Sequence, residues 1–461
     1  MIEYMEYIVR QFERSTGWNR DNSYENITAT SDNVLQLQIP SSFNLQVSNQ
    51  STPYTFTTFE LSNHKVINGS LSYLYTDCND MKQLVQASTD IRLHTMVDTF
   101  RFIKPYCGID RRAALEAAKG DEFVKHTLLY GRMYYPGSIL EAMYCRRLTQ
   151  HMQLVLKGLS WVNQPSFVTV YLQRDTGSTS QELIYSSNES LLGYRFLHNC
   201  LSSKSKLYNS IYNDSLLSFG AEFWLGIANM LPGCSTTLRY FTHATNTCKP
   251  ITLTLSFNPL FGHISSTYSV KPTLGSTLSA KYDFNVYSIE SDLTFGCELW
   301  KSSSALKLSE NLDLTAANRV DATSAKTGSA TGKEIARAET RNTKSQNIAT
   351  VNNGNFLDKM NATISFLDSV HNVKSPIEEF AKMINNTQFT SVLKCSSSIN
   401  NKNLKILWEG KYKEILISAG AELTNLPLDA PKTLSDDNSG ALARPVWLRP
   451  AKFGVMLQYS T

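Results

Sequence analysis

The last ten residues of the sequence, KFGVMLQYST at positions 452–461, carry the alternating pattern that decides the fold. Phe453, Val455 and Leu457 share one face of a predicted strand, because successive side chains of a strand point to opposite faces. A strand with an unpaired edge invites aggregation, and soluble proteins usually blunt such an edge. The pattern therefore favours a closed sheet in which this strand has a neighbour on each side.

The same two-residue period recurs along the chain. Phe43, Leu45 and Val47 alternate with polar residues, and residues 67–75 and 251–257 behave in the same way. Comparable segments lie at 127–136, 151–160, 167–175, 191–199, 276–289, 403–410 and 413–423. We count roughly sixteen to nineteen strands of about ten residues, the length that a tilted strand needs to cross a bilayer. The chain is predicted to be all-β, a transmembrane antiparallel β-barrel.

Before the first strand the period is that of a helix. Ile2, Met5, Val9 and Phe12 are spaced for one helical face, so residues 1–17 predict a short amphipathic helix. Residues 18–461 are predicted to form a single barrel. It is interrupted by three insertions. We expect the insertion near 76–126 to be partly helical, the one near 301–387 to begin with a disordered tract, and the one near 424–450 to form a mobile loop. Insertions of this length predict arms that face partners.

Composition excludes several classes of function. The 44 Lys and Arg against 40 Asp and Glu leave a net charge of +4 without a basic stripe, so no nucleic-acid partner is expected. No run of roughly 18 apolar residues predicts a transmembrane helix. The amino-terminal residues lack the features of a secretory signal or a transit peptide, so we expect them to be kept. The 22 Tyr, 21 Phe and 6 Trp suffice for aromatic girdles at two membrane interfaces.

Nothing in the sequence predicts catalysis, a cofactor or a metal site. The eight Cys residues include no CxxC spacing, so we expect mostly free thiols. There is no GxSxG, GxxxxGK[ST] or HExxH motif. The chain is therefore predicted not to be an enzyme. A soluble β-rich enzyme stays open only if distant strands assemble its site.

A short motif of glycine and glutamate occurs three times, in SFGAEFW, TFGCELW and SAGAEL. Strand parity puts each glycine and glutamate on one face and the apolar residues on the other. Lumen and lipid faces would require this arrangement, although ordinary solvent-facing glutamates would produce it too. The residues are Gly220, Glu222, Gly296, Glu298, Gly420 and Glu422.

Two aromatic pairs are the remaining candidates for function. Tyr73 and Tyr75 lie two residues apart on one strand face, and Tyr282 and Phe284 do the same. Such pairs serve either as girdle residues among lipid headgroups or as docking points for a protein. On physical grounds alone the girdle is favoured.

The end of the chain then becomes informative. Lys452, Gly454, Leu457 and Tyr459 fit the pattern polar-x-Gly-x-x-hydrophobic-x-hydrophobic, the sorting signal of mitochondrial outer-membrane barrels. More specific stretches are INGSLSYLYTD (67–77), LYGRMYYPGS (129–138), PGCSTTLRYFTHATNT (232–247) and AKYDFNVYSIESDLTFGCELW (280–300). With these the chain closely resembles, nearly end to end, the fungal mitochondrial distribution and morphology protein 10 family.

The resemblance implies a fold and a place in the cell. The family is similar to the voltage-dependent anion channel and the general import pore. That likeness implies 19 strands, a parallel closure of the first and last strands and an amino-terminal helix in the lumen. The expected location is the mitochondrial outer membrane, at contact sites with the ER.

The resemblance also implies a double membership. The chain looks like the membrane anchor of the ER-mitochondria encounter structure (ERMES), which serves phospholipid exchange, mitochondrial morphology and inheritance. It also looks like a subunit of the sorting and assembly machinery (SAM), which aids late assembly of β-barrel proteins and the import translocase (TOM). Implied partners are an ER membrane anchor, soluble lipid-transfer subunits, the SAM core barrel, its cytosolic-side subunits, a small TOM subunit and membrane lipids.

Within the family, aromatic residues that match Tyr73 and Tyr75 are associated with the tether, and those that match Tyr282 and Phe284 with the assembly machinery. We carry these roles over as expectations for this chain. The alternative function is a diffusion channel for small solutes, motivated by the predicted lumen face of glycine and glutamate.

Overall fold

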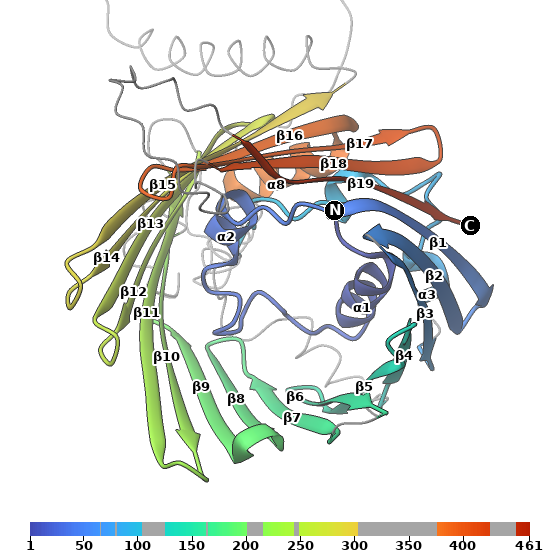
Figure 1. Ribbon diagram of the computed structural model, residues 1–461. Coiled ribbons are helices and arrows are strands. Elements are labelled where there is room, and N and C mark those ends of the chain that lie inside the picture. The colour runs from blue at the N-terminus through green and yellow to red at the C-terminus, as the bar shows by residue number, and fades with distance from the viewer. Residues whose placement is uncertain are drawn as a thin grey trace, which may run out of the picture. The chain divides into compact units, whose positions relative to one another are not determined.

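The computed structural model describes residues 1–64, 66–78, 81–103, 125–162, 165–200, 215–243, 249–302, 376–424 and 449–461. They contain one closed sheet of 19 strands (Figure 1). The chain divides into two compact units, Met1–Ser303 with Phe380–Thr461, and Ser304–Glu379. The barrel and the segments inside it belong to the first unit.

The strands follow one another around the ring in chain order, and short helices lie before and between them. The helices are α1 Tyr4–Ser15, α2 Ala29–Leu35, α3 Met81–Leu84, α4 Leu93–Met96, η1 Asn188–Ser190 and α8 Pro376–Asn386. The strands are β1 Ser42–Thr52, β2 Thr55–His64, β3 Val66–Thr76, β4 Thr127–Tyr135, β5 Ile139–Thr149, β6 Met152–Trp161, β7 Phe167–Asp175, β8 Thr179–Ser186, β9 Leu191–Asn199, β10 Leu216–Gly226, β11 Leu231–His243, β12 Pro250–Asn258, β13 His263–Thr273, β14 Ser276–Asn285, β15 Ser291–Ser302, β16 Phe389–Ser398, β17 Asn403–Tyr412, β18 Ile415–Thr424 and β19 Arg449–Ser460.

The ring closes between its first and last strands. All other neighbours are antiparallel, but β1 and β19 are parallel, with Ser42 opposite Gly454 and Ser48 opposite Ser460. With an odd number of strands, an even number of antiparallel steps brings the last strand back to the direction of the first, so the closing pair must be parallel. The predicted strand number, closure and barrel are confirmed, and residues 454–458 of the last strand are paired on both sides.

Alternate turns lie at the same end of an antiparallel ring, which defines two rims. We call rim A the end with the turns 136–138 and 227–230. Rim B is the opposite end, with the turns 150–151 and 274–275.

Side chains alternate between the two faces of the wall. On β3, Leu71 and Tyr73 are 59% and 51% exposed on the outside, whereas Ser70 and Ser72 are buried inside. Exposed apolar residues recur in this way on most strands, from Phe43 and Phe59 to Leu299 and Val455. A continuous apolar outer band is suited to lipid and not to water.

No helix among the described residues combines the length and the apolarity needed to cross a bilayer.

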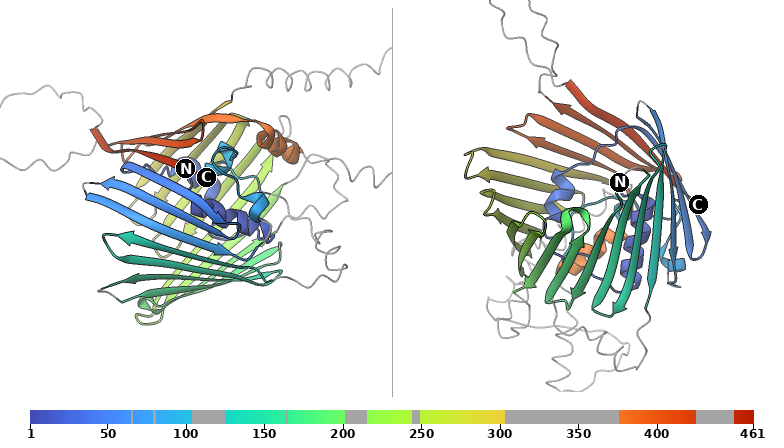
Figure 2. Two further views of the ribbon diagram at one scale, coloured as in Figure 1. Left: turned by 90° about the vertical axis from the view of Figure 1, so that its right-hand side faces the viewer. Right: turned by 60° about the horizontal axis from the view of Figure 1, so that its bottom comes forward.

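Helix α1 lies inside the barrel (Figures 1 and 2). Its residues Ile8 and Phe12 are completely buried, in one cluster with Phe56, Leu74 and Leu128 of the inner wall. A helix of 12 residues is marginal in water, so this packing stabilises it. Each large apolar side chain buried here contributes about 1.5–3 kcal/mol.

Ion pairs attach the polar face of α1. Arg10 Nη1 lies 2.8 Å from Asp98 Oδ1, and Arg132 Nη1 of β4 lies 2.8 Å from Glu3 Oε2. Burial alone would raise the pKa of Asp98, but Arg10, Arg101 and Lys394 outweigh burial and hold it below its usual value. Asp98 is therefore charged at neutral pH, and the pair with Arg10 persists.

The predicted insertions are only partly described. Helices α3 and α4 lie within the predicted insertion 76–126, and residues 18–41 include α2 before β1 begins at Ser42. Residues 104–124, 303–375 and 425–448 lie outside the described residues, and so do the predictions of disorder or mobility for them.

The described cysteines are free thiols, as predicted: Cys78, Cys145, Cys200, Cys234, Cys297 and Cys395. Cys107 and Cys248 lie outside the described residues.

Candidate partner-binding surfaces

The first aromatic pair stands on the outer wall near rim B. Tyr73 and Tyr75 of β3 are 51% and 39% exposed. Gly131 of β4 is opposite Tyr73, and a side chain added at Gly131 would meet no atom within 4 Å. Tyr73 therefore has no side chain beside it on β4, which leaves it accessible to a partner from that side.

The second aromatic pair stands on the outer wall near rim A. Tyr282 of β14 is 47% exposed, and Phe284 is half-buried beside it. Their lipid-side neighbours in register include Ile264 of β13 and Leu293 of β15. Each aromatic residue of this pair therefore has one large apolar neighbour and one serine, Ser266 beside Tyr282 and Ser291 beside Phe284.

The two pairs lie far apart on one barrel. Strands β3 and β14 are on different sides of the ring (Figure 1). One pair is near rim B and the other near rim A. The structure does not bring the two predicted surfaces together, so a single partner of ordinary size could not cover both.

The predicted sorting residues lie on β19, at the seam with β1. Lys452 is in register with Glu422 of β18, and Leu457 is in register with Leu45 of β1. Tyr459 is in register with Val47. Whether these four residues act as a sorting signal stays a prediction, but they occupy the strand that closes the ring.

Gly454 is the member of this set with a clear steric role. A side chain carbon built at Gly454 would meet the backbone oxygen of Pro40, at 2.5 Å, and that of Ser42. Backbone atoms cannot move aside cheaply, so the chain entering β1 can pass the inner face of β19 only at a glycine.

The glycine and glutamate motif faces the lumen, as predicted. Glu298 is completely buried, and Glu222 accepts a hydrogen bond of 2.8 Å from Ser235 Oγ. The three glycines share a steric role that the sequence did not indicate. Added side chains would strike the amino-terminal segment: Gly220 would meet Tyr24, Gly296 would meet Val34 and Leu35, and Gly420 would meet Ile39.

We call Gly220, Gly296, Gly420 and Gly454 the glycine track. They lie on the inner faces of β10, β15, β18 and β19, and residues 24–42 pass them in chain order. The track lets the segment lie close against the wall. Its glycines belong to strands far from residues 24–42 in sequence, so no local pattern could have found it.

The lumen also holds polar clusters that the sequence did not indicate. Arg195 of β9 lies 3.6 Å from Glu182 and 3.3 Å from Glu222. Around α1 a cavity of about 130 Å³ remains against the inner wall of β4 to β8. No described group of three or more His, Cys, Asp or Glu residues could hold a metal ion.

Comparison with known proteins shows which family the chain resembles over its whole length. The family described as mitochondrial distribution and morphology protein 10 matches residues 1–461. The chain belongs to this family. Proteins of that name from Eremothecium gossypii, Lachancea thermotolerans and Saccharomyces cerevisiae are 55%, 48% and 43% identical to it, and each alignment covers 100% of both chains. The family resemblance predicted from the sequence is confirmed.

Proposed function

We propose that this chain is a mitochondrial outer-membrane barrel that anchors the ER-mitochondria encounter structure and also serves the sorting and assembly machinery. Family membership and the relatives' names link it to mitochondrial distribution and morphology, and the barrel fold fits a mitochondrial membrane protein. The outer membrane, the contact sites and the two complexes are the finer part of the proposal.

One observation carries the proposal: two aromatic pairs on the outer wall lie on different sides and near opposite rims of one closed barrel. Such an arrangement supports separate partner surfaces, Tyr73 and Tyr75 for the tether and Tyr282 and Phe284 for the assembly machinery. The work requires no chemical step, so the barrel acts by binding and not as an enzyme.

The occupants of each surface follow from the proposal. Tether subunits, which include soluble lipid carriers and an ER membrane anchor, dock at the first pair. The core barrel of the assembly machinery and its cytosolic-side subunits use the second, and a small subunit of the import translocase competes with them. Competition then decides which complex forms, and membrane lipids cover the remaining wall.

The diffusion channel is the weaker alternative. Helix α1 and residues 24–42 lie against the inner wall, and buried apolar packing holds the helix there. A solute channel would require an open path past these segments.

The test compares two double variants by native gel electrophoresis of mitochondrial membranes. Tyr73→Ala with Tyr75→Ala should lose the tether complex and keep the assembly complex, and Tyr282→Ala with Phe284→Ala should do the reverse. Truncation of an aromatic anchor in an interface typically costs more than about 2 kcal/mol of binding free energy, so the amount of each affected complex should fall at least tenfold.

A matched control separates docking from a girdle role. Tyr185 and Tyr194 are exposed on the neighbouring strands β8 and β9, at 43% and 40%, and belong to neither pair. The variant with both changed to alanine should keep both complexes. If all three variants insert equally and retain both complexes, the assigned surfaces are wrong.

A further inference from the structure

At rim A, strands β2 and β3 extend beyond β4. The pairing of β2 with β3 continues to His64 and Val66, but that of β3 with β4 stops at Gly69 and Tyr135. Residues 66–68 of β3 therefore have a strand neighbour on one side only. We call this segment the β3 edge. Ile67 in the middle of it is 66% exposed.

Among the described strands, three other segments of three or more residues lack both a paired strand and a backbone hydrogen bond on one side. They are 231–235 of β11, 271–273 of β13 and 449–453 of β19. Each contains a proline, namely Pro232, Pro272 and Pro450. Proline has no N–H to donate and so blunts an edge against pairing. The β3 edge contains none and remains able to pair.

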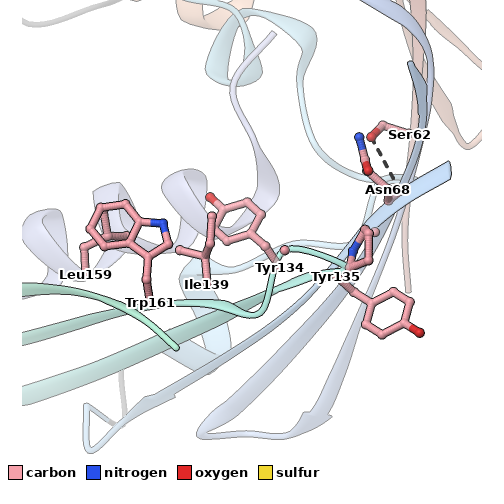
Figure 3. Close-up of a pocket in the computed structure, with 10 residues that line it drawn as sticks. Ser62, Asn68, Tyr134, Tyr135, Ile139, Leu159 and Trp161 are labelled. Carbon is pink, nitrogen blue, oxygen red and sulfur yellow. Dashed lines mark hydrogen bonds between the residues drawn. The ribbon is translucent and has the colours of Figure 1, made fainter. Parts of the chain in front are cut away.

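A cavity of about 480 Å³ adjoins the β3 edge (Figure 3). Ser62 and Asn68 line it on one side, and Tyr134, Ile139, Leu159 and Trp161 from the ends of β4, β5 and β6 line the other. Trp161 is held by an edge-to-face contact with Phe167, with ring centroids 5.6 Å apart. No charged side chain lines the cavity, so it suits a bulky, uncharged group.

We propose that an extended, uncharged segment of a partner polypeptide docks here, adding a short strand to the β3 edge and placing one bulky apolar side chain in the cavity. Alternate residues of a strand direct their N–H and C=O groups to opposite sides, and the Thr76 N–H donates to the Tyr54 carbonyl oxygen on the β2 side. Within the β3 edge Ile67 therefore directs its N–H and C=O to the open side, where an extended backbone can pair with both. A lipid chain would fill the cavity but leave those groups unpaired. Strand addition with a side-chain pocket is an established mode of peptide recognition.

This surface is distinct from both aromatic pairs. It lies at rim A on β3, whereas Tyr73 and Tyr75 lie toward rim B on the same strand. The inference therefore stands or fails independently of the proposed tethering and assembly roles.

The experiment uses the full chain in lipid nanodiscs and a fluorescent heptapeptide, Thr-Val-Thr-Phe-Thr-Val-Thr, acetylated and amidated at its ends. Fluorescence anisotropy should show saturable binding. A copy with every peptide nitrogen between its residues methylated keeps every side chain but cannot donate hydrogen bonds from those nitrogens, so it should bind at least tenfold more weakly.

Protein variants test the cavity. Trp161→Ala should weaken binding of the heptapeptide about tenfold or more, because it removes the largest apolar wall. Phe261→Ala, a change at another exposed aromatic of rim A, should alter binding less than about twofold, since Phe261 is 69% exposed and far from β3 around the ring.

Three outcomes would overturn the proposal. One is no saturable binding of the heptapeptide, and another is equal binding of the N-methylated copy. The third is quenching of Trp161 fluorescence by brominated phospholipid chains that the heptapeptide does not relieve, which would mean that lipid fills the cavity.

Discussion

At the scale of single residues, Gly454 has the least freedom to change. The backbone of Pro40 and Ser42 occupies the space that a side chain at Gly454 would need. The Pro40 carbonyl oxygen lies 2.5 Å from the position that a side chain carbon would take. Gly454→Leu should push β19 away from β1 and cost roughly 1–3 kcal/mol, as overpacking does. We expect a several-fold smaller carbonate-resistant fraction of newly imported protein.

Gly158→Leu is the control for this prediction. A side chain at Gly158 of β6 would meet its nearest atoms at 3.9 Å, an ordinary contact. This variant should insert normally. Equal insertion of both variants would show that the seam tolerates a side chain at Gly454, and the steric account of that glycine would be wrong.

At the scale of elements, the placement of α2 depends on one glycine of the wall. A side chain carbon at Gly296 of β15 would lie 2.9 Å from both Leu35 Cδ2 and the Val34 carbonyl oxygen. Ser396 Oγ of β16 also donates a hydrogen bond of 2.7 Å to the Leu35 carbonyl oxygen at the end of α2. Two neighbouring strands therefore hold the same turn.

Gly296→Val should displace α2 while the ring of strands persists, because β15 keeps both of its neighbours. Limited proteolysis in detergent should then cut residues 24–42 several-fold faster than in the unchanged protein. Gly131→Val, with open space around it, should leave the cutting rate unchanged. Unaltered proteolysis of the Gly296 variant would mean that α2 does not rely on this contact.

At the scale of the whole molecule, the barrel wall and the segments inside it have different tasks. The wall is closed by 19 ladders of backbone hydrogen bonds, whereas α1 is held by apolar packing and a few ion pairs. Helix α1 and residues 24–42 partly fill the lumen, so the outer wall and the rims are the surfaces left for partners.

Deletion of residues 2–17 should therefore keep the barrel folded but open its lumen. In planar bilayers we expect the unchanged protein to show a low conductance and the deletion variant a conductance several-fold higher. The double variant Arg10→Ala with Ile8→Ala should lie between them, since it removes the ion pair of Arg10 with Asp98 and one completely buried apolar side chain of α1. A high conductance of the unchanged protein would favour the diffusion channel.

Local patterns predicted much of this architecture. The alternation of Phe453, Val455 and Leu457, and the helical spacing of Ile8 and Phe12 with their neighbours, depend only on residues close in sequence. The resemblance supplied the strand number, which periodicity left between sixteen and nineteen. For the candidate surfaces, parity put Tyr73 and Tyr75 on one face but did not choose between a girdle role and protein docking.

What the sequence determined by itself was therefore the period of each segment and the family, because both are properties of neighbouring residues or of aligned residues. Only the tertiary structure decided which wall glycines meet residues 24–42, where α1 packs, and how far β2 and β3 extend beyond β4. Those features join residues that are far apart in the sequence. Ring closure and strand register set them, and no local pattern encodes either.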